Sequence, residues 1–178
     1  RRGGGGGGVI HTVSVLVENK PGALARVSNL FARRGFNIES LAVGPTERPE
    51  VSRITLRVDC SPHTLEQIEK QMHKLVNVLR VTTLEAGEAV ERELALVKVS
   101  APPGRRAELM ALAEVFDARV ADLGPDSMIF EVVGAPEELE AFEELIRPQG
   151  LKELARTGRV GLGRASATRS PRPQHVLR

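Results

Sequence analysis

The sequence predicts an α+β protein built from two ferredoxin-like βαββαβ domains in tandem. Strand and helix patterns follow the order βαββαβ from residue 9 to residue 85, and the same order recurs from residue 93 to residue 160. A short charged segment with a glycine, residues 86–92, separates the two patterns and is assigned as a linker. The chain length of 178 residues fits two small domains.

The first half opens with a β-rich run, residues 9–17, followed by a turn and a helix. Pro21 is placed at the first helical position, where a missing N–H costs nothing, and Gly35 is the expected helix end. The helix is indicated by apolar residues at helical spacing: Leu24, Val27, Leu30 and Phe31.

A hairpin, a helix and a strand complete the first pattern. Residues 36–43 and 51–58 form the hairpin, because Ile54, Leu56 and Val58 alternate with polar residues. Ser61 and Pro62 start the helix as a capping serine and a first-turn proline. Residues 76–84 return as a strand.

The second half repeats the order with different residues. Strands are expected at 94–99, 119–123, 127–133 and 151–156, with helices at 109–116 and after Ala135-Pro136. Residues 158–163 carry three glycines but lack a phosphate-loop signature. We assign residues 161–178 to a disordered tail and the Gly-rich residues 1–8 to a disordered lead-in or tag without the features of a signal peptide.

The computed pI of 9.0 comes from the ends of the chain. Seven of the 25 basic residues lie before residue 9 or from residue 159 onward, so 18 basic residues face 23 acidic ones elsewhere. The folded part is mildly acidic and aromatics are scarce, which argues against a nucleic-acid partner. No apolar run approaches the roughly 20 residues of a membrane helix, so no membrane partner is expected either. Cys60 is the only cysteine, and we expect a reduced, cytoplasmic protein.

No catalytic or metal-binding constellation stands out. The four histidines, His11, His63, His73 and His175, lack metal-ligand spacing and are expected to be solvated. Cys60 lies at a strand end without a histidine placed to activate it.

The informative segment is the turn before the first helix. N–H groups at a helix start are unpaired and carry partial positive charge, which suits a carboxylate. A glycine allows close approach, asparagine side chains can orient an ammonium and a carboxylate, and leucine and isoleucine can form an apolar wall. The candidate residues for binding a small amino acid are Asn19, Gly22, Ala23, Leu24, Asn37 and Ile38.

The same residues also allow a plain structural interpretation. Asn19 to Gly22 is an ordinary turn sequence, Gly35 an ordinary helix end, and Asn37 could form a local hydrogen bond. The two segments flank one helix, so they cannot share a pocket within one subunit. A single pocket requires a second copy, and a sheet with one poorly covered face or edge also favours a homodimer.

Two runs now resemble a known family. Residues 16–27 with the Pro-Gly-Ala-Leu turn are typical of the ACT-domain superfamily, and Arg34 to Leu41 (Arg-Gly-Phe-Asn-Ile-Glu-Ser-Leu) resembles the small regulatory subunits of acetolactate synthase, also called acetohydroxyacid synthase. The run from Arg92 to Val99 is similar to the start of the second domain in that family, and the likeness spans roughly residues 9–166.

This resemblance implies an N-terminal ACT domain followed by an ACT-like domain, without an active site of its own. It implies binding to a large catalytic subunit that carries thiamine diphosphate, Mg and FAD, and activation of that subunit. It also implies feedback inhibition of branched-chain amino acid biosynthesis by valine or a related branched-chain amino acid, bound at an ACT dimer interface. The six candidate residues match the family's effector contacts by position. Family members often carry serine where Ala25 stands, so a hydroxyl contact is missing here.

Two other classes stay open. The chain could be an amino-acid-sensing ACT protein that regulates another enzyme or a transcription factor, although neither a helix-turn-helix pattern nor a basic face is present. An independent small enzyme with a ferredoxin-like fold is disfavoured by the missing catalytic constellation.

Overall fold

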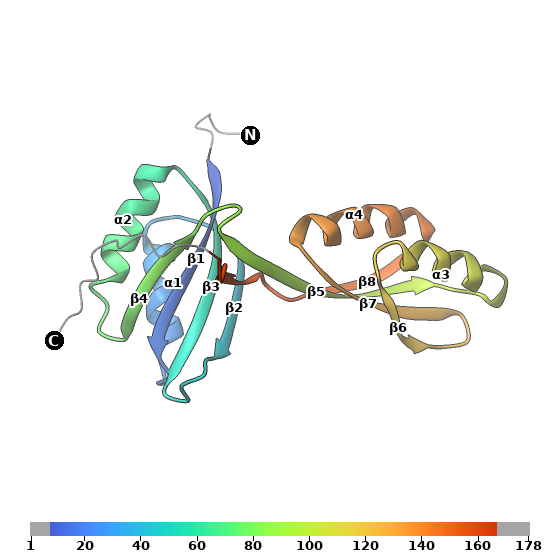
Figure 1. Ribbon diagram of the computed structural model, residues 1–178, viewed down its shortest axis with the longest axis horizontal. Coiled ribbons are helices and arrows are strands. Elements are labelled where there is room, and N and C mark those ends of the chain that lie inside the picture. The colour runs from blue at the N-terminus through green and yellow to red at the C-terminus, as the bar shows by residue number, and fades with distance from the viewer. Residues whose placement is uncertain (1–7, 167–178) are drawn as a thin grey trace.

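The computed structural model describes residues 8–166. Residues 1–7 and 167–178, which contain nearly all of the expected lead-in, most of the expected tail and His175, lie outside the described part. Two sheet-and-helix domains follow one another along the chain, and β5 (Ala89–Ser100) runs from one to the other (Figure 1).

The first domain has the expected βαββαβ order. Its elements are β1 (Val9–Glu18), α1 (Ala23–Arg33), β2 (Ile38–Pro45), β3 (Val51–Cys60), α2 (Pro62–Met72) and β4 (Val78–Leu84). The strands form one antiparallel sheet in the order β2-β3-β1-β4. This crossed order is the ferredoxin-like plan that the sequence predicted, with β2 and β4 at the edges.

The second domain repeats the plan. Its elements are β5, the 3₁₀ turn Pro103–Arg105, α3 (Arg106–Glu114), β6 (Arg119–Leu123), β7 (Ser127–Gly134), α4 (Pro136–Ile146), the 3₁₀ turn Arg147–Gln149, β8 (Leu151–Arg156) and β9 (Val160–Gly163). The strand order is β6-β7-β5-β8, and β9 pairs separately with the first residues of β5.

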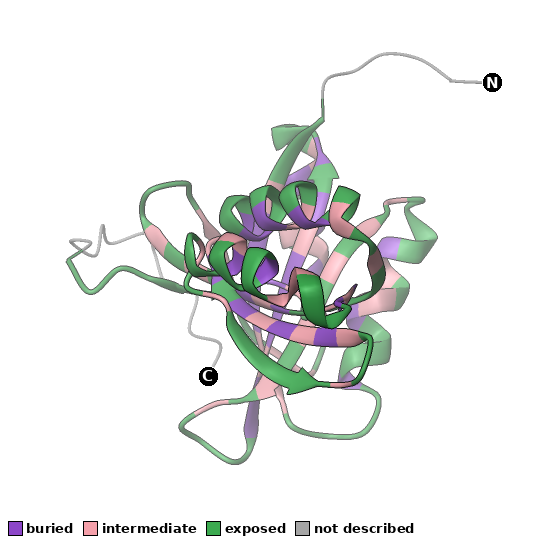
Figure 2. Ribbon diagram, turned by 90° about the vertical axis from the view of Figure 1, so that its right-hand side faces the viewer, coloured by how far each residue is buried: buried purple, intermediate pink, exposed green. Residues whose placement is uncertain are grey.

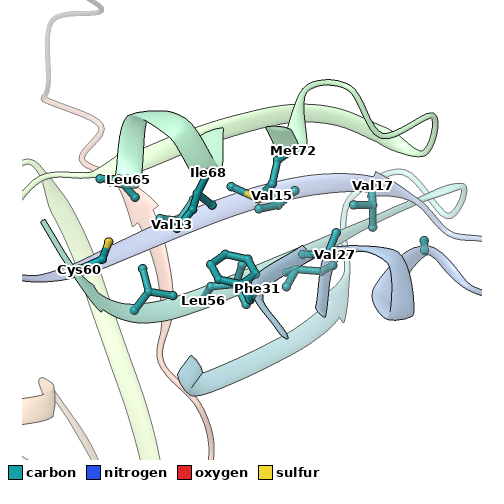
Figure 3. Close-up of a cluster of buried hydrophobic side chains, with 13 residues drawn as sticks. Val13, Val15, Val17, Val27, Phe31, Leu56, Cys60, Leu65, Ile68 and Met72 are labelled. Carbon is teal, nitrogen blue, oxygen red and sulfur yellow. The ribbon is translucent and has the colours of Figure 1, made fainter. Parts of the chain in front are cut away.

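Each domain has its own core between one face of the sheet and two helices. In the first domain, Val13 and Leu56 of the sheet meet Phe31 of α1 and Met72 of α2 (Figure 3). In the second, Val97 and Phe130 meet residues of α3 and α4. Figure 2 shows the same division, since buried residues line the facing sides of strands and helices. The alternation seen in the sequence therefore marks the helix-covered faces correctly.

Local signals placed the starts of α2 and α4, whereas α3 begins at Arg106, before the expected residue 109. Ser61 caps α2 by accepting a hydrogen bond from the Thr64 N–H, and Pro62 is the first helical residue, as predicted. Pro136 begins α4, and the Glu138 carboxylate accepts a hydrogen bond from the Ala135 N–H. The placement of Pro21 in α1 is wrong, because that helix begins at Ala23.

Two segments differ from the expected organisation. Residues 89–92, expected in a linker, are the first part of β5, and the intervening turn is confined to residues 85–88. Residues 161–163, expected in the disordered tail, belong to the strand β9, which begins at Val160. One pairing explains both differences. Residues Ala89 to Arg92 pair antiparallel with Val160 to Gly163, so the backbone N–H and C=O groups of each segment find hydrogen-bond partners in the other.

The ribbon made by β5 and β9, called here the β5–β9 ribbon, covers part of the first sheet on the side away from α1 and α2. Thr12, Ser14 and Thr55 project to that side, yet each is at most 5% exposed. A Cβ on Gly161 of β9 would lie 2.7 Å from the Leu84 side chain of β4. The second half of the chain therefore returns to shield the first domain.

The second core yields a stability prediction. Phe142 of α4 is fully buried and packs edge-on against Phe116 and Phe130. We expect Phe142→Ala to lower the free energy of unfolding of the second domain by about 3–5 kcal/mol, because it leaves a cavity. Leu145→Ala on the same helix, at a position 36% exposed, should cost less than about 1 kcal/mol. Denaturant titrations followed by circular dichroism measure both, and equal losses would contradict this assignment of the core.

Candidate functional site

The turn between β1 and α1 is a tight, glycine-dependent turn. The Ala23 N–H donates to the Lys20 carbonyl at 3.3 Å, and Gly22 has φ +87° and ψ −10°. These dihedrals are those of the third residue of a type II turn, in which proline favours the second position. Pro21 therefore serves the turn and not the helix, which explains why α1 starts at Ala23.

The start of α1 has no side-chain cap. Within residues 8–166, neither the Leu24 N–H nor the Ala25 N–H has a hydrogen-bond acceptor, while the Arg26 N–H already bonds to the Gly22 carbonyl. Unpaired donors at a helix start carry partial positive charge and bind anions. No side chain lies within 4 Å of a Cβ built on Gly22, so the space beside these donors is open.

Asn19 ties this turn to the loop between β2 and β3. Its backbone N–H donates to the Glu50 carbonyl at 2.8 Å, and its side-chain Nδ2 donates to the Pro49 carbonyl at 3.1 Å. The side-chain amide nitrogen is thus engaged in the protein, which leaves the Asn19 carbonyl oxygen for a ligand. The hydrogen bonds also place the turn at the end of the sheet where β2 ends.

A charged network supports the same turn. The Glu18 carboxylate contacts the Lys20 ammonium at 3.0 Å and accepts from Asn77 at 3.0 Å, and Arg26 donates to Asn77 at 2.7 Å. Hydrogen bonds from Lys20 and Asn77, together with the charge of Lys20, lower the pKa of Glu18. The Lys20 charge is therefore balanced by Glu18. The free N–H groups at the start of α1 remain as the groups that can attract an anion.

The other expected site residues lie at the far end of α1. Asn37 and Ile38 follow the end of the helix, and Ile38 is the first residue of β2. Eleven helical residues span about 16 Å at 1.5 Å per residue. One chain does not bring Asn37 to Asn19, in agreement with the expectation that opposite ends of a helix cannot share a pocket.

The apolar residues near the site have different surroundings. Ala23 is buried in the first core, so only its backbone faces the turn. Ile38 packs partly against that core, whereas Leu24 of α1 is 39% exposed. Leu41 and Val43 of β2 are also exposed, although they pair with the core residues Leu56 and Ile54 and so project to the helix-covered face. Exposed apolar residues thus mark the first turn of α1 and the edge of the sheet.

The described residues offer little for catalysis. Within residues 8–166, no three His, Cys, Asp or Glu side chains are grouped to hold a metal ion. His63 and His73 are exposed, but His11 is half-buried, which departs from the expected solvation. Cys60 is a free, buried thiol at the end of β3. No helix of the described chain is long and apolar enough to span a membrane.

Sequence reasoning missed a polar cluster where the two domains meet, which we call the Arg159 cluster. Its members are Arg159, Glu91, Glu93, Arg156 and Thr12. A cleft of about 420 Å³ lies beside it and is lined by both domains, including Ser40 and Arg57 of the first and Thr157 and Gly158 of the second. Single-residue patterns gave no signal for this cluster, because Arg159 stands in a glycine-rich stretch that looks like a tail.

Comparison with protein families divides the chain at the same place as the structure. Residues 13–80 match a family model described as an ACT domain like that of the AHAS small subunit. Residues 92–165 match a second model, described as the small subunit of acetolactate synthase. The second match includes β9, which the sequence patterns had assigned to a tail.

Individual proteins are similar over nearly the whole chain. A protein of Archaeoglobus fulgidus named "Probable acetolactate synthase small subunit" is 50% identical over 88% of this chain and 98% of its own. The acetolactate synthase small subunit of Mycolicibacterium smegmatis is 48% identical over 86% of this chain and 91% of its own. The crystal structure of the small subunit from Thermotoga maritima is 43% identical and superimposes with a TM-score of 0.83, covering 89% of this chain and 99% of that one.

Cys60 allows a test of its inert environment. Burial, and secondly the charge of Asp59, raise the pKa of the Cys60 thiol. A smaller thiolate fraction and restricted access should both slow its reaction with a disulfide reagent. We expect labelling at pH 8 to be at least about tenfold slower in the folded protein than in denaturant. Equal rates would contradict the buried position of this thiol.

Proposed function

The chain belongs to the family of acetolactate synthase small subunits, and on that premise we propose that it regulates the catalytic subunit in response to valine. It binds a thiamine-diphosphate-dependent large subunit in the cytoplasm, raises the activity of that subunit, and transmits feedback inhibition. Thiamine diphosphate, Mg and FAD belong to the catalytic subunit in this proposal. The match across both domains and nearly the full length of the relatives supports the regulatory role.

The main support for a valine site is the start of α1, which lacks a side-chain cap and lies beside Gly22, where the surrounding space is open. The valine carboxylate binds the N–H groups of Leu24 and Ala25, where partial positive charge and free donors coincide. The carbonyl oxygens of Asn19 and of a second copy's Asn37 accept from the ammonium group. Leu24 and Ile38 contact the isopropyl group.

A side-by-side homodimer through β2 brings the two halves of this site together. Asn19 is bonded to Pro49 and Glu50, so it lies where β2 ends, whereas Asn37 lies where β2 begins. If two β2 edges pair antiparallel, the beginning of one strand lies against the end of the other. Asn37 of one copy then approaches the Asn19 turn of the other copy. Two equivalent sites result from the twofold symmetry.

The condition of the β2 edge supports this pairing. In the described chain β2 hydrogen-bonds only to β3, so its outer edge has free backbone groups. Such edges are usually blocked, covered or paired. Leu41 and Val43 are 36% and 47% exposed and would be covered by a partner.

Reconstitution with the catalytic subunit tests the proposal. We expect the chain to raise the rate of acetolactate formation and to make that rate sensitive to valine.

Gly22→Asp should abolish the valine inhibition, because the carboxylate of the new side chain occupies the position of the valine carboxylate and repels it. The matched control is Gly87→Asp, since Gly87 also has a positive φ and open surroundings but lies far along the chain in the turn before β5. Normal valine inhibition of the Gly22→Asp enzyme would refute this site, and failure of the unaltered chain to bind or activate the catalytic subunit would refute the function.

The dimer has its own test. Val43→Lys places a charge from each copy at the β2 edge, and we expect the protein to sediment as a monomer and to bind valine at least about tenfold more weakly. Leu79→Lys on the opposite edge strand β4, where the side chain is 48% exposed, should leave both properties unchanged. Analytical ultracentrifugation and calorimetry provide the measurements. A dimeric Val43→Lys protein with normal valine affinity would exclude pairing through β2.

A further inference from the structure

Arg159 is a buried charge that joins strands of both domains. The residue is 7% exposed, and its guanidinium contacts the carboxylates of Glu91 at 3.2 Å and Glu93 at 3.6 Å. The same group donates to the Thr12 hydroxyl of β1 at 3.5 Å. An unpaired buried charge is costly, so the position of Arg159 is fixed by these acceptors. Arg159 therefore ties the β5–β9 ribbon to the first sheet.

The residue before it is pressed against β2. A Cβ built on Gly158 would lie 2.6 Å from the Leu41 carbonyl oxygen and 3.0 Å from the Ala42 nitrogen. Both atoms belong to the backbone, which cannot yield as a flexible side chain would. The chain between β8 and β9 therefore rests directly on the middle of β2, and only glycine permits this distance.

The same segment continues into the second domain without a flexible joint. The Thr157 N–H donates to the Leu94 carbonyl at 2.9 Å, and the Thr157 hydroxyl accepts from the Leu94 N–H at 3.0 Å. Arg156 binds the Glu93 carboxylate at 2.5 Å and lies 3.6 Å from the Glu143 carboxylate of α4. A continuous set of contacts therefore connects β2, through Gly158 and Arg156, to β8 and α4.

We propose that the contact of Gly158 with β2, held in place by the Arg159 cluster, couples the valine site to the second domain. This inference rests on the proposed function, because β2 begins at Ile38 and carries the edge at which the second copy and valine are proposed to bind. Valine binding changes the position of β2, and the change shifts the second domain between two arrangements that affect the catalytic subunit differently. Such coupling requires only that valine bind one arrangement more tightly than the other.

The most specific test is a substitution that adds one methyl group and leaves every charge in place. Gly158→Ala must separate β2 from the ribbon, because the new Cβ meets backbone atoms. Gly163→Ala is the matched control, since Gly163 lies at the end of the following strand β9 and a Cβ there would have no atom within 4 Å. We expect Gly158→Ala to keep valine binding by the small subunit within threefold of the unaltered chain and to keep activation, while maximal valine inhibition of the holoenzyme falls to less than half. Gly163→Ala should behave as the unaltered chain.

The possible outcomes distinguish coupling from binding. Unchanged inhibition by the Gly158→Ala holoenzyme would overturn the proposal, and so would a loss of valine binding of more than about tenfold, which would make Gly158 part of the binding site. Failure of the unaltered chain to respond to valine would instead refute the proposed function. These results are separable because binding, activation and inhibition are measured independently.

A second measurement needs no variant and covers the case in which Gly158→Ala does not fold. Hydrogen exchange of the unaltered holoenzyme is recorded with and without valine. We expect peptides of β2 and peptides covering residues 156–163 to change protection together. A change confined to β2 and the turn before α1, with residues 156–163 unaffected, would overturn the coupling.

Discussion

An antiparallel sheet with both helices on one side leaves its other side to be covered, and this constraint organises the molecule. In the first domain the β5–β9 ribbon supplies part of the cover, so Thr12, Ser14 and Thr55 are buried on the side away from the helices. These residues are polar, and their partners come both from the sheet itself, as Arg53 of β3, and from the covering segment, as Arg159. Arg53 donates to the Ser14 hydroxyl at 2.6 Å, and Arg159 reaches Thr12. The ribbon thus donates a hydrogen bond from Arg159 to Thr12 of the first sheet, while the ion pairs of Arg159 with Glu91 and Glu93 hold the ribbon itself together.

This solution changes the connection between the domains. A flexible linker would let the domains move independently, but here β5 enters the second sheet as one strand of 12 residues, with β9 and then β8 beside it. Two antiparallel segments therefore cross the junction, and buried charges of Arg159 and Glu93 fix their position. Relative motion must bend this ribbon or shift it on the first sheet. Such a junction suits a regulatory protein, because it limits the independent motion of the two domains. A shift of one domain is then more strongly coupled to the position of the other.

A different constraint makes the proposed effector site incomplete in one copy. The donors for a carboxylate lie at the start of α1, while Asn37 lies about 16 Å away at its end. In the proposed dimer a second copy paired along β2 joins the two parts, so that ligand binding and assembly would support each other through linkage. Exposed apolar residues on β2 and the first turn of α1 are unfavourable in a monomer and useful at such an interface.

The sequence alone determined the order and type of the elements, since strand alternation, helical spacing, the Ser61 cap and the Pro136 helix start are local properties of the chain. It also located the turn from Asn19 to Leu24 and predicted that this turn forms half of a binding site. Tertiary structure decided what depends on distant partners. The strand β9 has four residues, two of them glycines and none of them polar, so only its pairing with residues 89–92 makes it a strand. Arg159 is buried only because Thr12, 147 positions away in the chain, and two carboxylates of β5 converge on it. Local patterns cannot encode such a meeting, because each partner by itself has the composition of an ordinary surface or tail residue.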